Sequence, residues 1–487
     1  MLTLMADYET GLEFNHKLLK GYREEEHLEQ HVLNIYKTLE QSGFITIKSS
    51  KYITDEALIP TVTSEDGQKW IPIKEHRVNM LKIKFKINPK YKMNENEKDK
   101  VKIKTEAVIF IPKLIDGTFF ILNGTKKYPI YQIVEESTYT TANTVTLKSL
   151  LMSLVMTQES RQIIDTNGEV HTGRVFILDL FKKQLNALYY FLSDLGYDET
   201  VKLFAKKKWF SLGEDPESLM EGEIAFQVNK NLTMFVNEKQ FKKNDMFRSF
   251  VIAMHEMLEK CNLDKLDDPN FWLSKLGLIF TKNTNNKLSK AETVLKSFKR
   301  ILDDTTKGVL RIDEENKENI FTLTAWIMRN YDELKKKDNF DLRNKRARLG
   351  EYIVFDLQKR FSNKTYTLLN SNKTINAQKI SSLASINPNE LITQIGKSSL
   401  VRYHNAVNDM DFFNVYLKWS KRGVQAMGES SKQSVNFRHR DINITQLKLL
   451  DLNTHSNNDP GMTGYFVPFA EFYDGMYFSP EGEYHLK

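Results

Sequence analysis

The chain has 487 residues, more than one core of the usual size can serve, so we expect two or three domains. Its composition, with 40% hydrophobic and 27% charged residues, excludes a disordered chain, and its net charge of +7 suits a polyanionic partner without requiring one. The single cysteine, Cys261, excludes an intrachain disulfide, and the lack of a long apolar run or a signal-peptide pattern predicts a cytoplasmic protein without a membrane span.

The first 112 residues predict one amphipathic helix and two half-buried strands. Within residues 18–41, apolar side chains recur at helical spacing among charges, as at Val32, Ile35 and Leu39. Residues 80–112 change to a period of two, in which apolar side chains alternate with lysines before and after a polar turn at 94–99. The lysine-lined face is a candidate polyanion surface, although a solvated edge protected by lysines is the simpler interpretation.

A two-residue hairpin is expected at Asn123-Gly124, which lies between two runs of aromatic and β-branched residues. Asn-Gly is the preferred dipeptide of such a turn because both of its positions need a positive φ. Pro129 lies inside the second run and cannot donate a hydrogen bond to a neighbouring strand. We therefore expect that strand to be an edge or to carry a bulge.

The middle of the chain predicts both helices and strands. A helical stripe that starts near Leu185 ends at Gly196, where a left-handed C-cap is expected. Further helices are expected at 246–260, 288–302 and 349–361, and the segment 223–237 predicts two paired strands. In the last 90 residues Gly, Asn, Ser and His are so frequent that only short elements fit. Loops held on a scaffold tend to carry function.

The chain is expected to have no catalytic machinery of its own. His27 and His31 lie four residues apart on the first helix, but Leu28 breaks the metalloprotease order and no third ligand is in view. Neither a phosphate-binding loop nor a Gly-x-Gly-x-x-Gly turn is present. The carboxylates at 303–304 and 313–318 lie in a charge-rich connection, where solvation explains them.

Positive charge is clustered in the last third of the chain, in segments 341–351, 416–428 and 435–443. The first cluster stands at the predicted start of a helix. Arginine can hold two phosphate oxygens at once, and phosphate charge supplies most of the affinity in nucleic-acid complexes. Each cluster alone is typical of a solvated surface, but three of them within a hundred residues favour a nucleic-acid groove.

In chain order, these segments resemble the N-terminal half of the β subunit of multisubunit DNA-directed RNA polymerases. Residues 117–132 are similar to the family's Gly-Thr-Phe block with its Asn-Gly-Thr turn, and 187–204 to its lobe helix with Leu-Gly-Tyr. Segment 338–351 resembles the Asp-x-x-Gly-Asn-Arg-Arg-x-Arg block, with Arg343 where Gly is usual. Three further similar blocks follow in the family's order, at 375–381, 420–428 and 437–443.

The resemblance implies a mixed α and β, multidomain fold with a protrusion, a lobe and the start of a fork. The protrusion would comprise residues 1–137 and 349–398, the lobe 138–335, and the fork 336–348 and 399–487. Such a chain would form one wall of the DNA cleft and hold the RNA–DNA hybrid near the active centre. The alternative is a nucleic-acid-binding or virion structural protein derived from a polymerase β subunit.

The resemblance also implies roles for individual residues. The residues expected to bind nucleic acid are Lys345, Arg346, Arg348, Arg402, Lys421 and Arg422. The residues expected to shape the fork are Arg440, Asp441, Thr454 and Asn458, although segment 454–464 departs from the family's Thr-Pro-Glu-Gly-Pro-Asn block.

Catalysis and partners are expected to come from other chains. Two-metal nucleotidyl transfer needs carboxylates, and the resemblance places them and their Mg²⁺ on a β′-like chain. The implied partners are a C-terminal β fragment, β′-like chains, a promoter-specificity factor, the DNA template and nascent RNA, without a membrane. A β subunit split in this way resembles the arrangement in giant tailed bacteriophages. The expected location is the cytoplasm of a bacterial host, with packaging in the virion left open.

Overall fold

The structure is a computed structural model with helices and several sheets, the mixed α and β, multidomain class that the sequence predicts. It describes residues 25–62, 76–91, 103–115, 119–129, 131–141, 143–149, 152–180, 182–206, 208–215, 218–259, 261–281, 284–337, 341, 344–348, 353–370, 376–397, 401–403, 418–420, 444, 450–451, 463–466, 472–473 and 477–478. None of the helices in these ranges is long and apolar enough to cross a membrane.

The chain divides into two compact units. One, called here the discontinuous unit, comprises Met1–Glu136 and Asp338–Lys487, and the other, the inserted unit, comprises Ser137–Lys337. The two ends of the inserted unit meet, since the Tyr331 hydroxyl donates to the Asn143 carbonyl at 2.8 Å. The inserted unit spans nearly the residues that the resemblance assigns to a lobe, 138–335. That its fold is a polymerase lobe stays a prediction.

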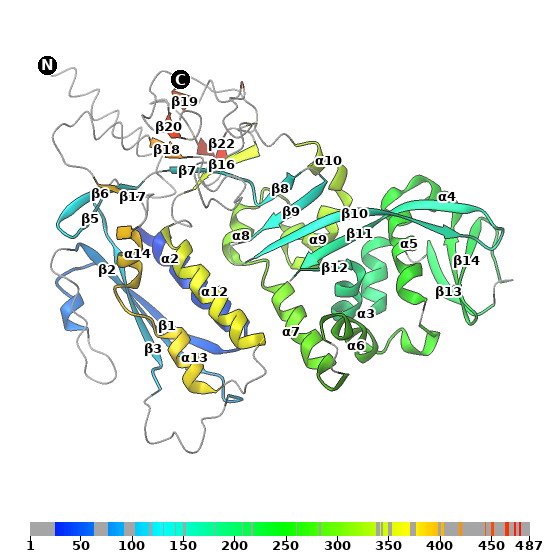
Figure 1. The fold of residues 1–487 in the computed structure, drawn as a ribbon, viewed down its shortest axis with the longest axis horizontal. Coiled ribbons are helices and arrows are strands. Elements are labelled where there is room, and N and C mark those ends of the chain that lie inside the picture. The colour runs from blue at the N-terminus through cyan, green and yellow to red at the C-terminus, as the bar shows by residue number, and fades with distance from the viewer. Residues whose placement is uncertain are drawn as a thin grey trace. The chain divides into compact units, whose positions relative to one another are not determined.

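The core of the discontinuous unit lies between a three-stranded antiparallel sheet and four helices (Figure 1). The strands are β1 (Ile45–Ile53), β2 (Val78–Ile87) and β3 (Glu106–Pro112), with β2 in the centre, and the helices are α2 (Glu25–Gln41), α12 (Phe355–Asn370), α13 (Ala377–Ala384) and α14 (Glu390–Lys397). Both halves of the unit fill this core. The rings of Tyr36 and Phe361 lie 5.3 Å apart, and the Tyr36 hydroxyl donates to the Ala384 carbonyl at 2.7 Å.

Strand β2 shows the predicted alternation, whereas β3 does not. In β2, Leu81 and Ile83 are buried and Lys84 is exposed. All seven residues of β3 are buried. The prediction that lysines alternate along this second strand is wrong. The last of the lysines that follow the predicted turn is Lys104, and the strand begins at Glu106. The predicted polar turn at 94–99 lies outside the described residues.

The hairpin at Asn123-Gly124 is confirmed, with φ of 52° and 69° at the two turn residues. It joins β5 (Phe119–Leu122) to β6 (Thr125–Pro129), in a sheet completed by β4 (Leu114–Ile115) and β17 (Val401–Tyr403). The expectation of an edge strand is wrong, because β6 pairs with β5 on one side and with β17 on the other. Pro129 is tolerated there as the last residue of the strand.

The inserted unit surrounds a single apolar core with two antiparallel sheets and a group of helices (Figure 1). One sheet has the order β12-β11-β10-β9-β8, from β8 (Thr138–Thr141), β9 (Thr144–Lys148), β10 (Ser153–Ile164), β11 (Val170–Leu180) and β12 (Lys183–Asn186). The other has the order β13-β15-β14, from β13 (Phe210–Gly213), β14 (Glu223–Asn229) and β15 (Leu232–Asn237). The helices are α3 (Leu188–Phe204), α4 (Glu238–Lys243), α5 (Asp245–Leu258), α6 (Pro269–Phe280), α7 (Lys287–Lys299), α8 (Asp304–Val309), α9 (Ile320–Arg329) and α10 (Tyr331–Lys335).

Most of the predicted elements of the middle region are present. Helices α5 and α7 confirm the predictions at 246–260 and 288–302, and β14 with β15 confirms the paired strands. The helix predicted at 349–361 is confirmed in part by α12 (Phe355–Asn370), and residues 349–352 lie outside the described residues. The expected break at Gly196 is confirmed, since its φ of 78° and ψ of −178° are non-helical and separate two helical stretches. A second stretch follows the kink directly, so α3 as a whole continues to Phe204, and the ψ of Gly196 is not that of a left-handed C-cap.

The last part of the chain forms only short strands among its described residues, as predicted. Beside β17 these are β18 (Lys418–Ser420), β19 (Leu450–Asp451), β20 (Thr463–Phe466), β21 (Phe472–Tyr473) and β22 (Tyr477–Phe478). They join β7 (Tyr131–Glu135) and β16 (Lys345–Arg348) in a sheet with the order β19-β20-β18-β7-β16-β22-β21. This sheet contains several of the predicted nucleic-acid-binding residues.

Candidate nucleic-acid interface

The described basic residues of the first cluster lie on a strand. Residues Lys345–Arg348 form β16, which runs antiparallel to β7. Residues 349–352 lie outside the described residues and Ile353 is helical, so the position of the cluster at the entry to a helix stays a prediction. Four consecutive residues are too few to show a period of two against one of 3.6, so the pairing with β7 decided their conformation.

Segments that are far apart in the sequence meet around β7. Gln132 of β7 lies opposite Arg348 of β16 on one side and opposite Ser420 of β18 on the other. The predicted nucleic-acid-binding residues Lys421 and Arg422 follow Ser420 directly in the sequence. Figure 1 shows β7, β16 and β18 together in this part of the discontinuous unit.

The neighbouring hairpin brings a further predicted residue close in sequence to the same sheet. Arg402 of β17 lies opposite Tyr128 of β6, three residues before β7 begins. The side chains of Arg348 and Arg402 lie outside the described residues, although their backbones belong to described strands. The backbone therefore brings Arg348, Arg402 and the start of the Lys421 segment to two consecutive strands, β6 and β7.

Two of the predicted phosphate-binding residues are buried. The Lys345 and Glu135 side chains are only 6% and 5% exposed, and the Lys345 ammonium group forms an ion pair with the Glu135 carboxylate. Arg346, the next residue, is 6% exposed. The Lys345–Glu135 pair connects β16 to β7, where the two residues lie opposite each other. A role of either cation in nucleic-acid binding stays a prediction.

The remaining predicted residues lie outside the described residues. They are Lys421, Arg422, Arg440, Asp441, Thr454 and Asn458. The strand β20, which follows the last two of them, pairs with β18 through Thr463 opposite Ser420. The backbone that ends the 454–464 segment is thus a neighbour of the strand that precedes Lys421. The roles of these six residues stay predictions.

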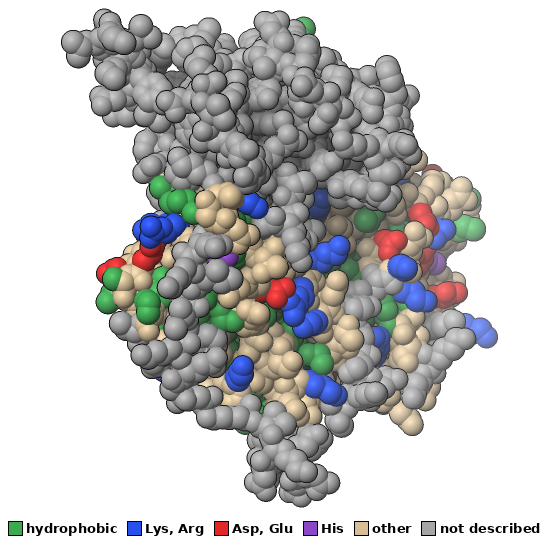
Figure 2. Space-filling view, turned by 60° about the vertical axis from the view of Figure 1, so that its left-hand side comes forward, with side chains coloured by type: hydrophobic (Ala, Val, Ile, Leu, Met, Phe, Trp, Pro, Cys, Tyr) green, Lys and Arg blue, Asp and Glu red, His purple; other side chains and the backbone are tan. Residues whose placement is uncertain are grey.

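On the face seen in Figure 2, the positive charge of the described residues does not form one continuous patch. Figure 2 shows Lys and Arg side chains scattered over the face in view, among neutral and apolar ones. On the lysine-lined strand β2, Lys84 and Lys86 are exposed, whereas Lys82 pairs with Glu106 of β3 at 2.9 Å. One of these three lysines is therefore already occupied by a carboxylate within the sheet.

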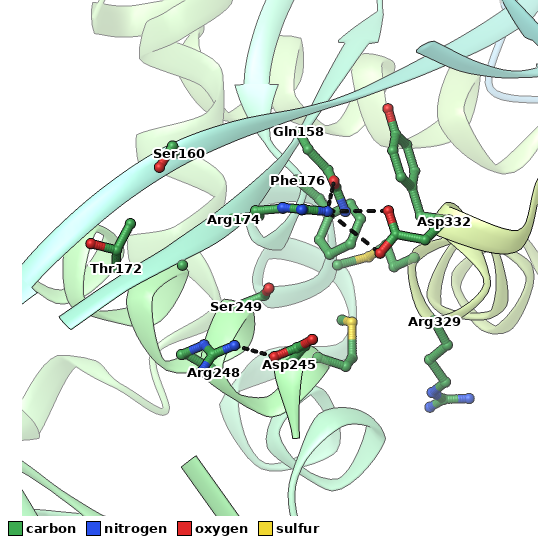
Figure 3. A pocket seen from close by; sticks show the side chains of 14 residues that line it. Gln158, Ser160, Thr172, Arg174, Phe176, Asp245, Arg248, Ser249, Arg329 and Asp332 are labelled. Atoms are coloured by element: carbon green, nitrogen blue, oxygen red, sulfur yellow. Dashed lines mark hydrogen bonds and ion pairs between the residues drawn. The ribbon is translucent and has the colours of Figure 1, made fainter. Parts of the chain in front are cut away.

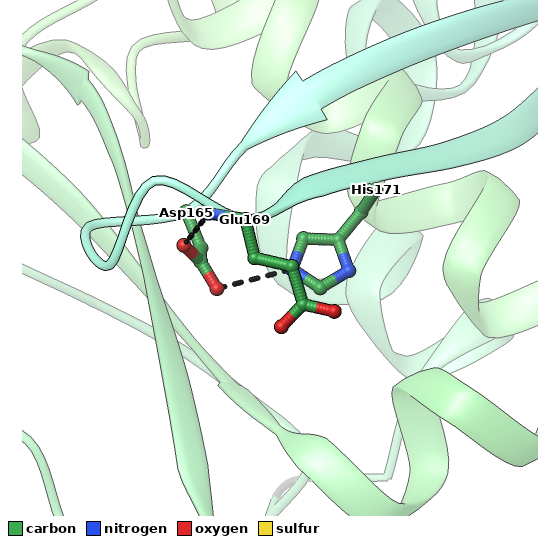
Figure 4. A group of neighbouring side chains, drawn as sticks. All are labelled: Asp165, Glu169 and His171. Carbon is green, nitrogen blue, oxygen red and sulfur yellow. Dashed lines mark hydrogen bonds and ion pairs between the residues drawn. The ribbon is translucent and has the colours of Figure 1, made fainter.

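The structure also shows one group of possible metal ligands that sequence reasoning missed. Ligand atoms of Asp165, Glu169 and His171 lie within 4.8 Å of one another at the tip of the β10–β11 hairpin (Figure 4). The sequence sign of this group is an aspartate, a turn at Asn167-Gly168 and a histidine within the seven residues 165–171. Both carboxylate oxygens of Asp165 have hydrogen-bond partners. Oδ1 accepts from the amides of Asn167 and Glu169, and Oδ2 lies 3.1 Å from His171 Nε2.

The contacts of this group indicate a brace for the hairpin. Burial by itself would raise the pKa of Asp165, but the hydrogen bonds from His171 and from the Glu169 and Asn167 amides outweigh it, so the pKa is lowered. The His171 ring lies edge-on to Phe226 and Phe241 at 5.5 and 5.4 Å. Asp165 therefore stabilises the turn and orients His171 through these hydrogen bonds.

Cys261 and Asp303 are two further side chains that could in principle carry chemistry. Burial raises the pKa of the Cys261 thiol, in spite of the nearby Lys275 and Lys265, so it is not activated as a nucleophile. Asp303 is 1% exposed and caps α8, accepting from the Thr306 amide at 2.8 Å. The sequence suggested that Asp303 is a solvated surface carboxylate. This expectation is wrong for Asp303, because its carboxylate is buried and caps a helix.

Comparison with known proteins assigns the chain to a family. A family model described as non-virion RNA polymerase subunit matches residues 2–481, nearly the whole chain. No curated protein matches the sequence. The match covers both compact units and all the segments that meet around β7. The chain therefore belongs to the family of non-virion RNA polymerase subunits.

Proposed function

We propose that this chain is the N-terminal part of a β-like subunit of a multisubunit DNA-directed RNA polymerase. In this role it forms one wall of the DNA cleft and holds the RNA–DNA hybrid near the active centre. Two observations support the proposal. The six similar sequence blocks occur in the order of the β subunit, and the family of the whole chain is that of an RNA polymerase subunit.

The convergence of strands around β7 carries the proposal. Blocks at 117–132, 338–351 and 420–428 are separated by long stretches of sequence, yet β16 and β18 both pair with β7. A surface that grips a polyanion needs several cations brought together by a rigid scaffold. The sheet supplies such a scaffold, because Arg348 and Ser420 lie on either side of Gln132.

The proposed roles differ between the buried and the other cations. Lys345 and Arg346 are buried, so in this proposal they hold β16 in place and support the neighbouring phosphate-binding residues. Arg348, Arg402, Lys421 and Arg422 contact phosphates of the template or the hybrid, mainly without reading sequence. Arg440, Asp441, Thr454 and Asn458 shape the fork.

Other chains complete the enzyme in this proposal. A β′-like chain holds the catalytic Mg²⁺, and a C-terminal β fragment and a promoter-specificity factor join it. The host is a bacterium infected by a giant tailed phage. The word non-virion in the family's description goes against packaging in the particle and against the alternative of a virion structural protein.

Copurification tests the assembly. The tagged full chain, expressed during infection, should recover stoichiometric amounts of a chain that carries the Asn-Ala-Asp-Phe-Asp-Gly-Asp loop and a chain similar to the C-terminal half of β. Template-directed RNA synthesis should copurify with them. Recovery of the chain alone, or with capsid proteins only, would contradict the proposal.

Salt sensitivity tests the contacts with nucleic acid. The double variant Arg402→Gln with Lys421→Gln removes two cations from segments joined to β6 and β7, so elongation complexes should dissociate at lower salt, with a salt slope reduced by about 2. The matched control, Lys202→Gln with Lys336→Gln, removes two exposed cations of the inserted unit. Equal salt profiles for both double variants and the unchanged enzyme would refute the assigned contacts.

A further inference from the structure

The inserted unit contains a pocket that the proposed function does not use. It has a volume of about 290 Å³ and lies between the exposed face of β10 and β11, the start of α5, and the junction of α9 with α10 (Figure 3). Ligand sites in proteins start at roughly 300 Å³, so this pocket has room for one end of a ligand and not for a large molecule.

The start of α5 presents unused donors to the pocket. The helix has 14 residues, and its cap residue Asn244 accepts from the Phe247 amide through its side chain and from the Arg248 amide through its carbonyl. The amides of Asp245 and Met246 have no acceptor among the described residues, and both residues line the pocket. Free amides and the helix dipole attract anions at such a position.

The Ser249 side chain provides an independent indication of a ligand. Ser249 is 6% exposed as a residue and lines the pocket, and its Oγ forms no hydrogen bond within the described part of the chain. Figure 3 shows it between Arg174 and the side chains of Arg248 and Asp245. Its hydroxyl is therefore available to donate to an acceptor atom that enters the pocket.

Two arginines at the pocket are held by carboxylates that a ligand can replace. Arg174 donates to Asp332 at 3.2 Å and to Gln158 at 3.3 Å, and Arg248 pairs with Asp245. The carboxylate side chains of Asp332 and Asp245 are 64% and 86% exposed. Such exposed ion pairs contribute little stability, so the carboxylates can turn into solvent when a stronger acceptor arrives.

The third arginine has a different role. Arg329 also lines the pocket, but it is exposed and donates to the Leu203 carbonyl at 2.7 Å, so it adds positive charge at the rim. The charged groups around the pocket are therefore three arginines and two aspartates. An incoming ligand must be rich in acceptors, negatively charged and small at its tip, which are the properties of a phosphate group.

We propose that this pocket binds a phosphate group through Arg174, Arg248, the Ser249 hydroxyl and the first amides of α5. The phosphate belongs either to a free nucleoside triphosphate or to a nucleic-acid strand. The proposal rests on the pocket alone and is independent of the chain's role in the DNA cleft. A failed copurification would contradict the polymerase role and leave the phosphate pocket untouched. A failure to bind phosphate would contradict the pocket and leave the polymerase role untouched.

Titration calorimetry on the full chain tests it, with a nucleoside triphosphate as probe in a magnesium-free buffer. Arg248→Met and Arg174→Gln should each weaken binding about tenfold, since each removes a charge-assisted hydrogen bond. Ser249→Ala should weaken it a few-fold, and Asp332→Asn should tighten it a few-fold, because the competing carboxylate is gone. The control Lys202→Met, at an exposed lysine of the same unit, should leave it unchanged.

A second probe distinguishes the two sources of the phosphate. A single-stranded oligonucleotide with a 5′-hydroxyl is titrated by fluorescence anisotropy. If the variants weaken only triphosphate binding, the ligand is a free nucleotide, and if they weaken only oligonucleotide binding, it is a strand. Thermal unfolding identifies any variant that fails to fold, and Ser249→Ala and Asp332→Asn, which preserve side-chain size, then carry the test. Binding of neither probe, or equal affinity in all variants, would overturn the proposal.

Discussion

At the residue scale, the pairing of Lys345 with Glu135 shows what a cation-rich motif can hide. The two residues are 210 positions apart in the sequence, and their side chains are almost completely buried. The simplest expectation for the side chains of a lysine- and arginine-rich motif is that they contact solvent or phosphate. The carboxylate on β7 that receives Lys345 is not visible from the motif itself, so the sequence could not separate Lys345 from its neighbours.

Truncating one partner of this pair should be far more harmful than replacing both. Lys345→Met leaves Glu135 buried and without its cation, which should cost about 3–5 kcal/mol in the free energy of unfolding. The double variant Lys345→Met with Glu135→Leu should recover most of that loss. Urea unfolding of the unchanged chain, Lys345→Met, Glu135→Leu and the double variant measures this coupling. A double variant as unstable as Lys345→Met alone would show that the pair is not the main interaction of Lys345.

The Asp165 carboxylate predicts a dependence of stability on pH. Its lowered pKa means that its contribution is fully present above the unfolded pKa of about 3.9 and is lost as the pH falls through the folded value. At pH 7 Asp165→Asn should cost about 1.5–3 kcal/mol, because charge-assisted hydrogen bonds are lost. The gap between the two proteins in urea unfolding should begin to narrow as the pH falls below about 3.9 and should go on narrowing toward the lowered folded pKa. A gap that is constant with pH would contradict this.

At the element scale, local patterns were sufficient where neighbouring residues decide the conformation. The Asn123-Gly124 hairpin and the alternation in β2 follow from turn chemistry and side-chain period. Local patterns failed where pairing with a segment far away in the sequence decides the conformation. Pro129 suggested an edge, but β17 pairs with β6 from more than 270 residues away. The four basic-segment residues Lys345–Arg348 carry no local sign of a strand, and their pairing with β7 makes them one.

The crossing of α6 and α7 depends on a glycine. A Cβ at Gly277 would lie 1.9 Å from the carbonyl oxygen of Lys287, which is a backbone atom. Gly277→Ala should therefore separate the helices and destabilise the inserted unit by roughly 1–3 kcal/mol or more. Thermal unfolding measures the effect.

Gly308→Ala is the matched control for this substitution. Gly308 lies in the helix α8, and a Cβ there would meet nothing within 4 Å. It should be neutral or stabilising by about 0.4–1 kcal/mol, because alanine restricts the unfolded chain. Equal losses in both variants would contradict close approach of the two helices as the cause of the effect at Gly277.

At the scale of the whole molecule, the inserted unit interrupts another unit without sharing its core. Its buried apolar cluster runs from Val145 to Leu334, whereas the other cluster draws on residues 28–133 and 353–395. The two halves of the discontinuous unit thus depend on each other, while the inserted unit is complete in itself.

This arrangement predicts how fragments should behave. Residues 137–337 expressed alone should give a soluble protein with a cooperative thermal transition, since the fragment contains its entire core. Residues 1–136 alone should not fold, because α12, α13 and α14 supply one side of their core. Circular dichroism and limited proteolysis distinguish the two. A fragment 137–337 without a cooperative transition would contradict the division into units.

The sequence by itself determined the mixed fold class, most of the helices of the middle region, the hairpin at Asn123-Gly124 and the resemblance to an RNA polymerase subunit. These follow from residues close together in the chain, or from blocks in a fixed order. Only the tertiary structure decided that Lys345 is buried against Glu135, that Asp165 braces a hairpin, and that Ser249 lines a pocket beside two arginines. Each of the three concerns a polar side chain whose surroundings hydrophobic periodicity does not reveal. For Lys345 and Ser249 those surroundings come from distant segments of the chain, and for Asp165 they come from the fold of the hairpin.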